Sequence, residues 1–258
     1  METEGFLKRP DGERPDGERL AWRKIDGAGP TVVWLGGFMS DMTGTKAQAL
    51  ADWATDLDRA YVRFDYLGHG QSSGVFRDGT ITRWRADALA VIDDLTTGDL
   101  VLVGSSMGGW IACLAAMART ERVKALVLIA PAPDFTEKLM SPNIPPEGHA
   151  ALAKDGVWLR PSEYGEPYPI TAALLEDGAR WSILDGGPIP IDVPVRILQG
   201  GQDPDVPWHH ALSLAQALRS DEVIFTLIKD GDHRLSRPSD IARMIGAVTE
   251  LSALQDGG

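Results

Sequence analysis

The chain has a single cysteine, Cys113, among its 258 residues. One thiol cannot form an intramolecular disulfide, and it excludes zinc and iron–sulfur centres that need several cysteines. A chain of this length buries roughly 70–75% of its unfolded surface, so it needs neither a disulfide nor a structural metal to fold. Cys113 lies among Ile, Ala and Leu residues, which predicts a buried apolar side chain.

Basic residues and long apolar runs are also scarce. There are 25 Lys and Arg residues against 37 Asp and Glu residues, and the formal net charge is −12 at pH 7. An acidic surface repels phosphate backbones and anionic membranes, so we expect no nucleic-acid partner. The apolar stretches Trp110–Ala118 and Ala125–Ala132 are far shorter than the roughly 20 residues that span a bilayer. We therefore expect no membrane insertion, and the sequence does not indicate an oligomeric state.

The N-terminal residues lack the apolar core of a secretory signal. They also mix acidic and basic side chains, whereas mitochondrial leaders are poor in acids. These features predict a cytoplasmic protein. The same segment repeats Pro-Asp-Gly-Glu-Arg in tandem, at Pro10–Arg14 and Pro15–Arg19, which predicts turns in an exposed loop.

From residue 31 onward, short apolar runs alternate with helix-like segments. The runs show little polar alternation, which is typical of parallel strands buried on both faces. The predicted strands are Thr31–Leu35, Tyr61–Phe64, Leu100–Val103, Ala125–Ile129, Val195–Leu198 and Val223–Ile228. The predicted helices are Lys46–Leu57, Thr82–Leu95, Ser106–Thr120, Trp208–Leu218 and Ser239–Leu251. This alternation predicts an α/β fold with a doubly wound, mostly parallel sheet.

Residues 131–194 interrupt the alternation. They contain 11 of the 17 prolines and no strand pattern, with helix-like pieces only around Glu147–Lys154 and Ile170–Asp177. A segment of this length is too long for a plain loop. We predict a helical lid at residues 131–194, inserted between late strands of a core formed by residues 1–130 and 195–258. Because ligands bind beyond the carboxyl ends of the strands in such sheets, the lid is expected near the binding site.

One strand leads into a motif that carries chemistry. After Leu100–Val103 the sequence reads Gly104-Ser105-Ser106-Met107-Gly108, followed by a predicted helix. Gly-x-Ser-x-Gly between a strand and a helix is the pattern of a nucleophile elbow. Side chains at Gly104 and Gly108 would collide with the neighbouring strand and helix, so glycine fits both positions. The pattern predicts Ser106 as the nucleophile, and the alternative is a tight turn used only for packing.

An acid and a histidine follow the last two predicted strands. Asp203 and Asp205 come after the first of these strands, and His233 comes after the second. Nucleophile, acid and histidine in this chain order are those of the α/β hydrolases. We predict that His233 takes the Ser106 proton and that an aspartate orients the imidazole. Asp203 is preferred because it lies closer to the end of the strand, and Asp205 is the alternative.

An oxyanion formed at Ser106 would need backbone donors. The Met107 N–H lies at the start of the predicted helix, and a second donor is expected from the loop after the first predicted strand. That loop reads Gly36-Gly37-Phe38, so Gly37 permits close approach and the Phe38 N–H is the predicted second donor.

No motif in the chain predicts a cofactor or a metal. The segment from Gly68 to Gly74 has glycines near dinucleotide-loop spacing, but its last glycine is misplaced and no helix follows directly. It is predicted to be a turn-rich loop, and His69 within it is in the wrong place for the catalytic base. His209 and His210 are adjacent and point in different directions, which disfavours a shared metal.

Five stretches together resemble a known family. They read GGFMSDMTGTKA, RFDYLGHGQSSG, LVGSSMGGW, DPDVPWHH and GDHRLS. They are similar to the α/β-hydrolase branch of acyl-protein thioesterases that includes the mitochondrial palmitoyl-protein depalmitoylase, also described as a mycophenolic acid acyl-glucuronide esterase. The resemblance covers roughly residues 20–250. It implies a cofactor-independent serine hydrolase in which Ser106, Asp203 and His233 form the triad, and Phe38 and Met107 the oxyanion hole.

The sequence therefore favours a serine hydrolase that cleaves carboxylic esters or thioesters of a small-molecule or acylated substrate. Two alternatives stay open. One is another reaction of the same fold, such as carbon–carbon bond hydrolysis. The other is a catalytically silent binding protein, which would be expected to lose a member of the triad.

Overall fold

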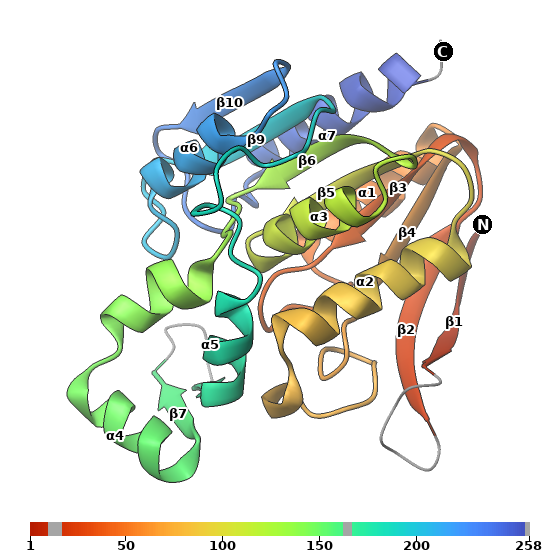
Figure 1. Cartoon of the computed structure of the whole chain (residues 1–258). Helices are drawn as coiled ribbons and strands as arrows, with labels where there is room; N and C mark the ends of the chain where they lie inside the picture. Colours follow the sequence, from red (N-terminus) through yellow and green to blue (C-terminus); the bar gives the residue numbers. More distant parts are fainter. Residues whose placement is uncertain (10–16, 162–166, 256–258) are drawn as a thin grey trace.

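The computed structural model describes residues 1–9, 17–161 and 167–255. Its centre is a sheet of eight strands in the order β1-β2-β4-β3-β5-β6-β9-β10, shown in Figure 1. The strands are β1 (Glu2–Arg9), β2 (Glu18–Ile25), β3 (Ala28–Leu35), β4 (Arg59–Phe64), β5 (Leu100–Ser105), β6 (Val123–Ile129), β9 (Val195–Gly200) and β10 (Val223–Ile228). All neighbours from β4 to β10 are parallel, whereas β1 and β2 are antiparallel.

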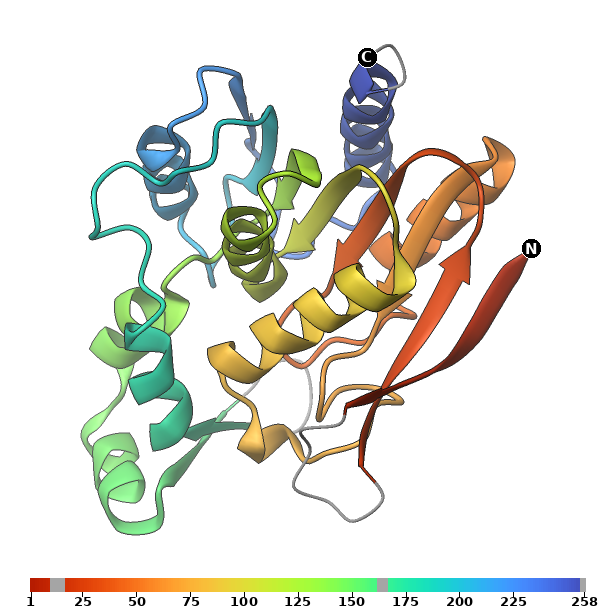
Figure 2. The same cartoon turned by 45° about the vertical axis from the view of Figure 1, so that its right-hand side comes forward.

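Helices cover both faces of the sheet. They are α1 (Thr45–Asp56), α2 (Ile81–Leu95), α3 (Met107–Ala118), α6 (Trp208–Ala217) and α7 (Pro238–Gln255). One apolar core joins the sheet to α2, α3 and α6, and a second joins the other face to α1 and α7. In Figure 2, α2 and α3 lie on the near side of the sheet and α7 lies behind it. The predicted doubly wound, mostly parallel α/β fold is confirmed.

The side chains of β5 point alternately into the two apolar cores, which explains why both faces of this strand are apolar. Leu100 and Leu102 pack into the core with α2 and α3, whereas Val101 and Val103 pack into the core with α1 and α7. All six residues of the strand are buried. A strand buried on both faces has no polar face, which is why these runs were recognisable in the sequence.

The prediction of turns in an exposed loop at residues 10–19 is wrong for Glu18 and Arg19, which lie in a strand of the sheet. β1 pairs with β2 along its whole length, and β2 pairs with β4. β1 forms the edge of the sheet and its side chains are mostly exposed, so charged residues replace the apolar run that marks an inner strand. Residues 10–16 of the tandem repeat lie outside the described residues, whereas Glu18 and Arg19 belong to β2.

Residues 131–194 lie between β6 and β9, and we call them the inserted segment. They contain η2 (Thr136–Met140), η3 (Ser141–Asn143), α4 (Pro146–Asp155), β7 (Val157–Arg160), β8 (Tyr168–Thr171) and α5 (Ala172–Ala179). The expectation of no strand here is wrong, because β7 and β8 form an antiparallel pair. Each has only four residues, and Pro169 lies within β8, so neither gives a recognisable pattern.

Asp134 connects the start and the end of the inserted segment. Its carboxylate accepts hydrogen bonds from the Ile183 and Leu184 N–H groups and from the Ser182 hydroxyl. The residue is 1% exposed. A buried carboxylate with three donors stabilises this junction. Among the described helices, none has the length and apolarity required to cross a bilayer.

Candidate active site

Ser106 lies at the sharp turn between β5 and α3. Its backbone has φ 55° and ψ −119°, a left-handed conformation that a non-glycine residue rarely adopts. A Cβ atom at Gly104 would lie 2.3 Å from the Gly108 carbonyl oxygen. A Cβ atom at Gly108 would lie 2.0 Å from the Leu35 carbonyl oxygen. The turn therefore requires both glycines, and it places Ser106 at the wall of a cavity.

The structure brings Ser106, His233 and Asp203 together from three separate strand ends. The His233 Nε2 atom lies 3.1 Å from the Ser106 Oγ atom, and its Nδ1 atom lies 2.8 Å from Oδ2 of Asp203. The Asp203 side chain is fully buried, whereas the His233 side chain is 20% exposed. In this arrangement Nδ1–H donates to the carboxylate, and Nε2 is left to accept the serine proton.

The surroundings of Asp203 explain why it, and not Asp205, faces the histidine. Its Oδ1 atom accepts from the backbone N–H groups of Asp205 and Val206, at 2.9 and 2.8 Å. Its Oδ2 atom accepts from Gln199 Nε2 at 3.1 Å as well as from His233. These bonds fix the carboxylate, and Asp205 contributes its backbone N–H to them.

Asp203, Asp205 and His233 have ligand atoms within 4.8 Å of one another, the spacing of a metal site. However, both oxygens of Asp203 already accept hydrogen bonds from N–H donors. A metal bound there would have to displace those donors, leaving buried N–H groups unpaired. The hydrogen bonds of Asp203 therefore fit a role in orienting His233 better than a role as a metal ligand.

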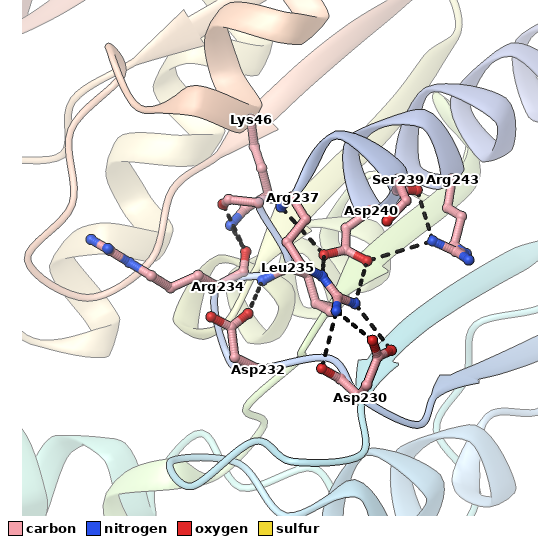
Figure 3. A network of polar contacts seen from close by, with 10 residues as sticks. Lys46, Asp230, Asp232, Arg234, Leu235, Arg237, Ser239, Asp240 and Arg243 are labelled. Atoms are coloured by element: carbon pink, nitrogen blue, oxygen red, sulfur yellow. Dashed lines mark hydrogen bonds and ion pairs between the residues drawn. The ribbon is translucent and has the colours of Figure 1, made fainter.

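The loop that carries His233 is stabilised by a network of charged side chains, shown in Figure 3. Arg237 donates to both Asp230 and Asp240, with N–O distances of 2.7 Å to each carboxylate. Nζ of Lys46 in α1 donates to the Arg234 carbonyl oxygen, next to His233. Burial lowers the pKa of Lys46 to about 8, and the nearby Arg234 charge adds to this effect. The loop is thus held from α1 and from α7.

Two residues beside the serine have backbone N–H groups available to a ligand. Phe38 and Met107 both line the cavity at Ser106. Neither N–H has a hydrogen-bond acceptor within the part of the chain that the structure describes. A Cβ atom at Gly37 would lie 3.5 Å from the Ser106 Cβ atom, so the loop passes directly beside the serine. Unpaired donors at this position fit an oxyanion hole.

The cavity that contains Ser106 and His233 has a volume of about 870 Å³. The inserted segment and the Phe38 loop supply an apolar wall made of Phe38, Phe135, Leu139, Met140, Trp158 and Tyr168. The Phe38 ring lies 5.7 Å from the Phe135 ring and 6.0 Å from the Tyr168 ring. Charged and polar side chains line the remainder: Asp41, Lys46, Asn143, Arg160, Asp205 and Arg234.

Three residues near the site were not identified from the sequence: Gln199, His69 and Lys46, the last of which contacts the loop of His233. Gln199 supports Asp203, and the available signal was a polar residue that follows the apolar pair Ile197 and Leu198 near the end of β9. His69 was assigned to a turn, but its Nε2 atom accepts a hydrogen bond from the Met39 N–H in the loop beside Ser106. Cys113 is fully buried in α3, as predicted.

Comparison with known proteins gives several matches along the whole chain. The model of the alpha/beta hydrolase family matches residues 10–244. The human protein named Palmitoyl-protein thioesterase ABHD10, mitochondrial, is 38% identical over 240 residues, which cover 92% of this chain and 78% of that protein. The Rattus norvegicus protein of the same name is 37% identical over 251 residues, which cover 96% of this chain and 82% of that protein.

Solved structures give the same result. A protein from Agrobacterium vitis S4, named only as a hydrolase, is 45% identical with a TM-score of 0.93, and the match covers 98% of this chain and 99% of that one. Mouse alpha/beta hydrolase domain-containing protein 10 is 35% identical with a TM-score of 0.87, and the match covers 96% and 98%.

The prediction of a cytoplasmic location is corrected by these comparisons. The relatives from cattle, orangutan, human and rat all carry the word mitochondrial in their names. The prediction depended on the composition of the N-terminal residues. In the structure Glu2–Arg9 and Glu18–Ile25 are strands of the sheet, so their composition reflects the fold and does not report the compartment.

Proposed function

The chain belongs to the alpha/beta hydrolase family, and on that premise we propose that it cleaves carboxylic esters or thioesters through an acyl-enzyme on Ser106. The resemblance to the palmitoyl-protein thioesterase branch, seen first in short motifs, is confirmed along the chain. One observation carries the proposal: a continuous chain of hydrogen bonds runs from Ser106 Oγ through His233 to the buried Asp203, and Ser106 and His233 line a large cavity.

The first half of the reaction forms the acyl-enzyme. His233 Nε2 accepts the Ser106 proton while Oγ attacks the acyl carbonyl carbon. The carbonyl oxygen becomes an oxyanion, which the Phe38 and Met107 N–H groups stabilise. Asp203 stabilises the imidazolium. The tetrahedral intermediate then collapses, and His233 gives its proton to the departing alcohol or thiol.

The second half releases the acyl group. A water molecule takes the place of the leaving group, and His233 removes its proton as the water attacks the acyl carbon. The same N–H groups stabilise the second oxyanion. Collapse of this intermediate breaks the bond to Ser106 Oγ, which recovers its proton from His233, and the carboxylic acid leaves.

The residues that the inserted segment contributes to the cavity favour an acylated substrate. We assign residues 131–194 as a lid over a core formed by residues 1–130 and 195–258. The lid supplies most of the apolar wall of the cavity, which suits an acyl chain. The polar side of the same cavity suits the more hydrophilic leaving group. The relatives named palmitoyl-protein thioesterase support a long acyl chain as the natural group.

Labelling with a fluorophosphonate probe tests the proposal. Wild type should be labelled, and Ser106→Ala should not. Ser105→Ala is the matched control, because Ser105 is the neighbouring serine but ends β5 with 7% exposure. A folded wild-type protein that stays unlabelled would favour a binding protein without catalytic activity.

Substrate turnover tests the reaction type. We expect hydrolysis of p-nitrophenyl esters and acyl-CoA thioesters over a range of chain lengths, with no detectable turnover by His233→Ala. Labelling without hydrolysis of any ester or thioester would instead favour a different reaction of the fold, such as carbon–carbon bond hydrolysis.

A further inference from the structure

The loop that carries Phe38 is held by a second loop that the mechanism above does not use. The segment from Asp65 to Gly74 lies beside it, and two hydrogen bonds join the two loops. The Met39 N–H donates to His69 Nε2 at 3.2 Å. The Met42 N–H donates to Asp65 Oδ1 at 2.7 Å, and Oδ2 of the same carboxylate accepts from the Gln71 N–H. The loop therefore has one support close to Phe38 and one farther along.

The surroundings of His69 fix its tautomer. Its Nδ1 atom lies 3.3 Å from the Leu67 carbonyl oxygen, which can only accept a hydrogen bond. Nδ1 therefore carries the hydrogen, and Nε2 presents its lone pair to the Met39 N–H. The residue is 3% exposed and its ring contacts Tyr66, Phe76 and Trp84. Burial lowers the pKa of His69 to about 4, so the ring is neutral at physiological pH.

The loop needs such a support because its backbone is strained. Met39 has φ 54°, the left-handed region that a residue with a side chain rarely adopts. Phe38 lies between this residue and Gly37, which passes beside Ser106. The Phe38 ring packs 4.8 Å from Phe76 and 5.8 Å from Trp84, two of the rings that enclose His69. Phe38 and His69 thus belong to one aromatic cluster, and His69 also binds the N–H of the peptide group that joins Phe38 to Met39.

We propose that His69 is a positioning residue, which holds the Phe38 N–H in the oxyanion hole through its hydrogen bond to the Met39 N–H. The inference rests on the proposed function, since it requires an oxyanion at Ser106. Backbone donors stabilise an oxyanion because they are already aligned before charge develops. Without the His69 acceptor the strained residue can relax, and the neighbouring N–H loses its alignment.

Three variants separate this role from simple packing. His69→Leu removes the acceptor and keeps an apolar side chain in the aromatic cluster. His69→Gln places an amide oxygen near the position of Nε2, so it can still accept from the Met39 N–H. His210→Leu is the matched control: His210 is 8% exposed, and its Nε2 lies 2.8 Å from the Pro133 carbonyl oxygen, a contact that includes no residue of the Phe38 loop.

For His69→Leu we expect kcat for a p-nitrophenyl ester to fall by about 10- to 100-fold with little change in KM, since a fully lost donor costs about 10²–10³ in kcat. A boronic acid that forms a tetrahedral adduct with Ser106 should lose affinity by a similar factor. His69→Gln should recover most of both losses. His210→Leu should keep wild-type kcat. Near-ultraviolet circular dichroism establishes that each variant is folded.

Each result has one interpretation. Wild-type kcat and boronic acid affinity in folded His69→Leu would overturn the inference, while fluorophosphonate labelling of wild type would still support the proposed function. Equal losses in His69→Leu and His69→Gln would also overturn it, because packing and not the acceptor would then matter. An unlabelled wild type would remove the proposed function itself. If His69→Leu does not fold, His69→Gln is compared with His69→Asn, whose shorter amide cannot reach the Met39 N–H. Higher kcat and tighter boronic acid binding in His69→Gln than in His69→Asn would support the inference, and equal values would overturn it.

Discussion

Replacing Asp203 by asparagine removes one negative charge and leaves the shape of the side chain unchanged. The amide has two orientations. If its NH2 group takes the place of Oδ1, it faces the N–H groups of Asp205 and Val206, which then lose their acceptor. If it takes the place of Oδ2, it faces His233 Nδ1 and Gln199 Nε2.

The two orientations differ in free energy. An unpaired buried N–H costs about 1–3 kcal/mol, so the first orientation costs about 2–6 kcal/mol. In the second orientation only the hydrogen bond from Gln199 is lost. The imidazole can move its hydrogen from Nδ1 to Nε2, and Nδ1 then accepts from the amide. We therefore expect the amide to donate to His233 Nδ1. The histidine then carries its hydrogen on Nε2, facing the Ser106 hydroxyl, and cannot accept the serine proton.

The expected loss in kcat is about 10³- to 10⁴-fold, the size of effect known for a triad histidine held in the wrong tautomer. This corresponds to about 4–5.5 kcal/mol in the barrier. The assay is steady-state hydrolysis of a p-nitrophenyl ester at pH 7.5, with circular dichroism to establish folding. Asp205→Asn is the matched control, and we expect its kcat to stay within about threefold of wild type.

A folded Asp203→Asn with kcat within tenfold of wild type would refute this reasoning. A large loss in Asp205→Asn together with a small one in Asp203→Asn would exchange the roles of the two aspartates. Loss of folding in Asp203→Asn would show that the second orientation is not available, and Asp203→Glu would then test the position of the carboxylate.

Three further predictions concern the elbow, the cysteine and the buried histidine. Gly108→Ala should lower the free energy of unfolding in urea by about 1–3 kcal/mol and slow fluorophosphonate labelling, because its Cβ would meet the Leu35 carbonyl oxygen at 2.0 Å; unchanged values would contradict the elbow geometry. Cys113 should react with a thiol reagent at pH 8 only after denaturation, because burial raises its pKa to about 12; rapid reaction of the native protein would contradict its burial. The folded-state pKa of His69 is about 4 against an ordinary value of 6.5, so the unfolded chain binds the extra proton and stability is lost as pH falls from 6.5 to 4. Across this range wild type should lose about 3 kcal/mol more in free energy of unfolding than His69→Gln, and parallel pH profiles would argue against a buried neutral His69.

The inner sheet could be predicted from the sequence because strands buried on both faces have no polar face to obscure them. β5 and β6 are examples, and the predicted helices around them begin and end within a few residues of the observed ones. β1 could not be predicted, since an edge strand with exposed side chains looks like a charged loop. β7 and β8 were missed because four residues are too few to establish a period, and their pairing depends on the inserted segment as a whole.

The predicted site residues share a simple physical signal. Ser106, Asp203 and His233 each follow the end of a parallel strand, and parallel strands bring those ends to one edge of the sheet. His69 gave no such signal, since its contribution depends on which loop lies opposite its ring. Gln199 and Lys46 are similar cases, because a side chain that supports another residue can be recognised only once its partner is known.

Rapid-quench mass spectrometry with a p-nitrophenyl ester tests the acyl-enzyme on Ser106 most directly. Samples quenched during turnover are digested, and the peptide that contains Ser106 is weighed. We predict a mass gain equal to the acyl group on this peptide, appearing with the first release of p-nitrophenol and absent from Ser106→Ala. Steady hydrolysis by wild type with the Ser106 peptide unmodified at every time, even with an ester whose deacylation is slow, would contradict the account.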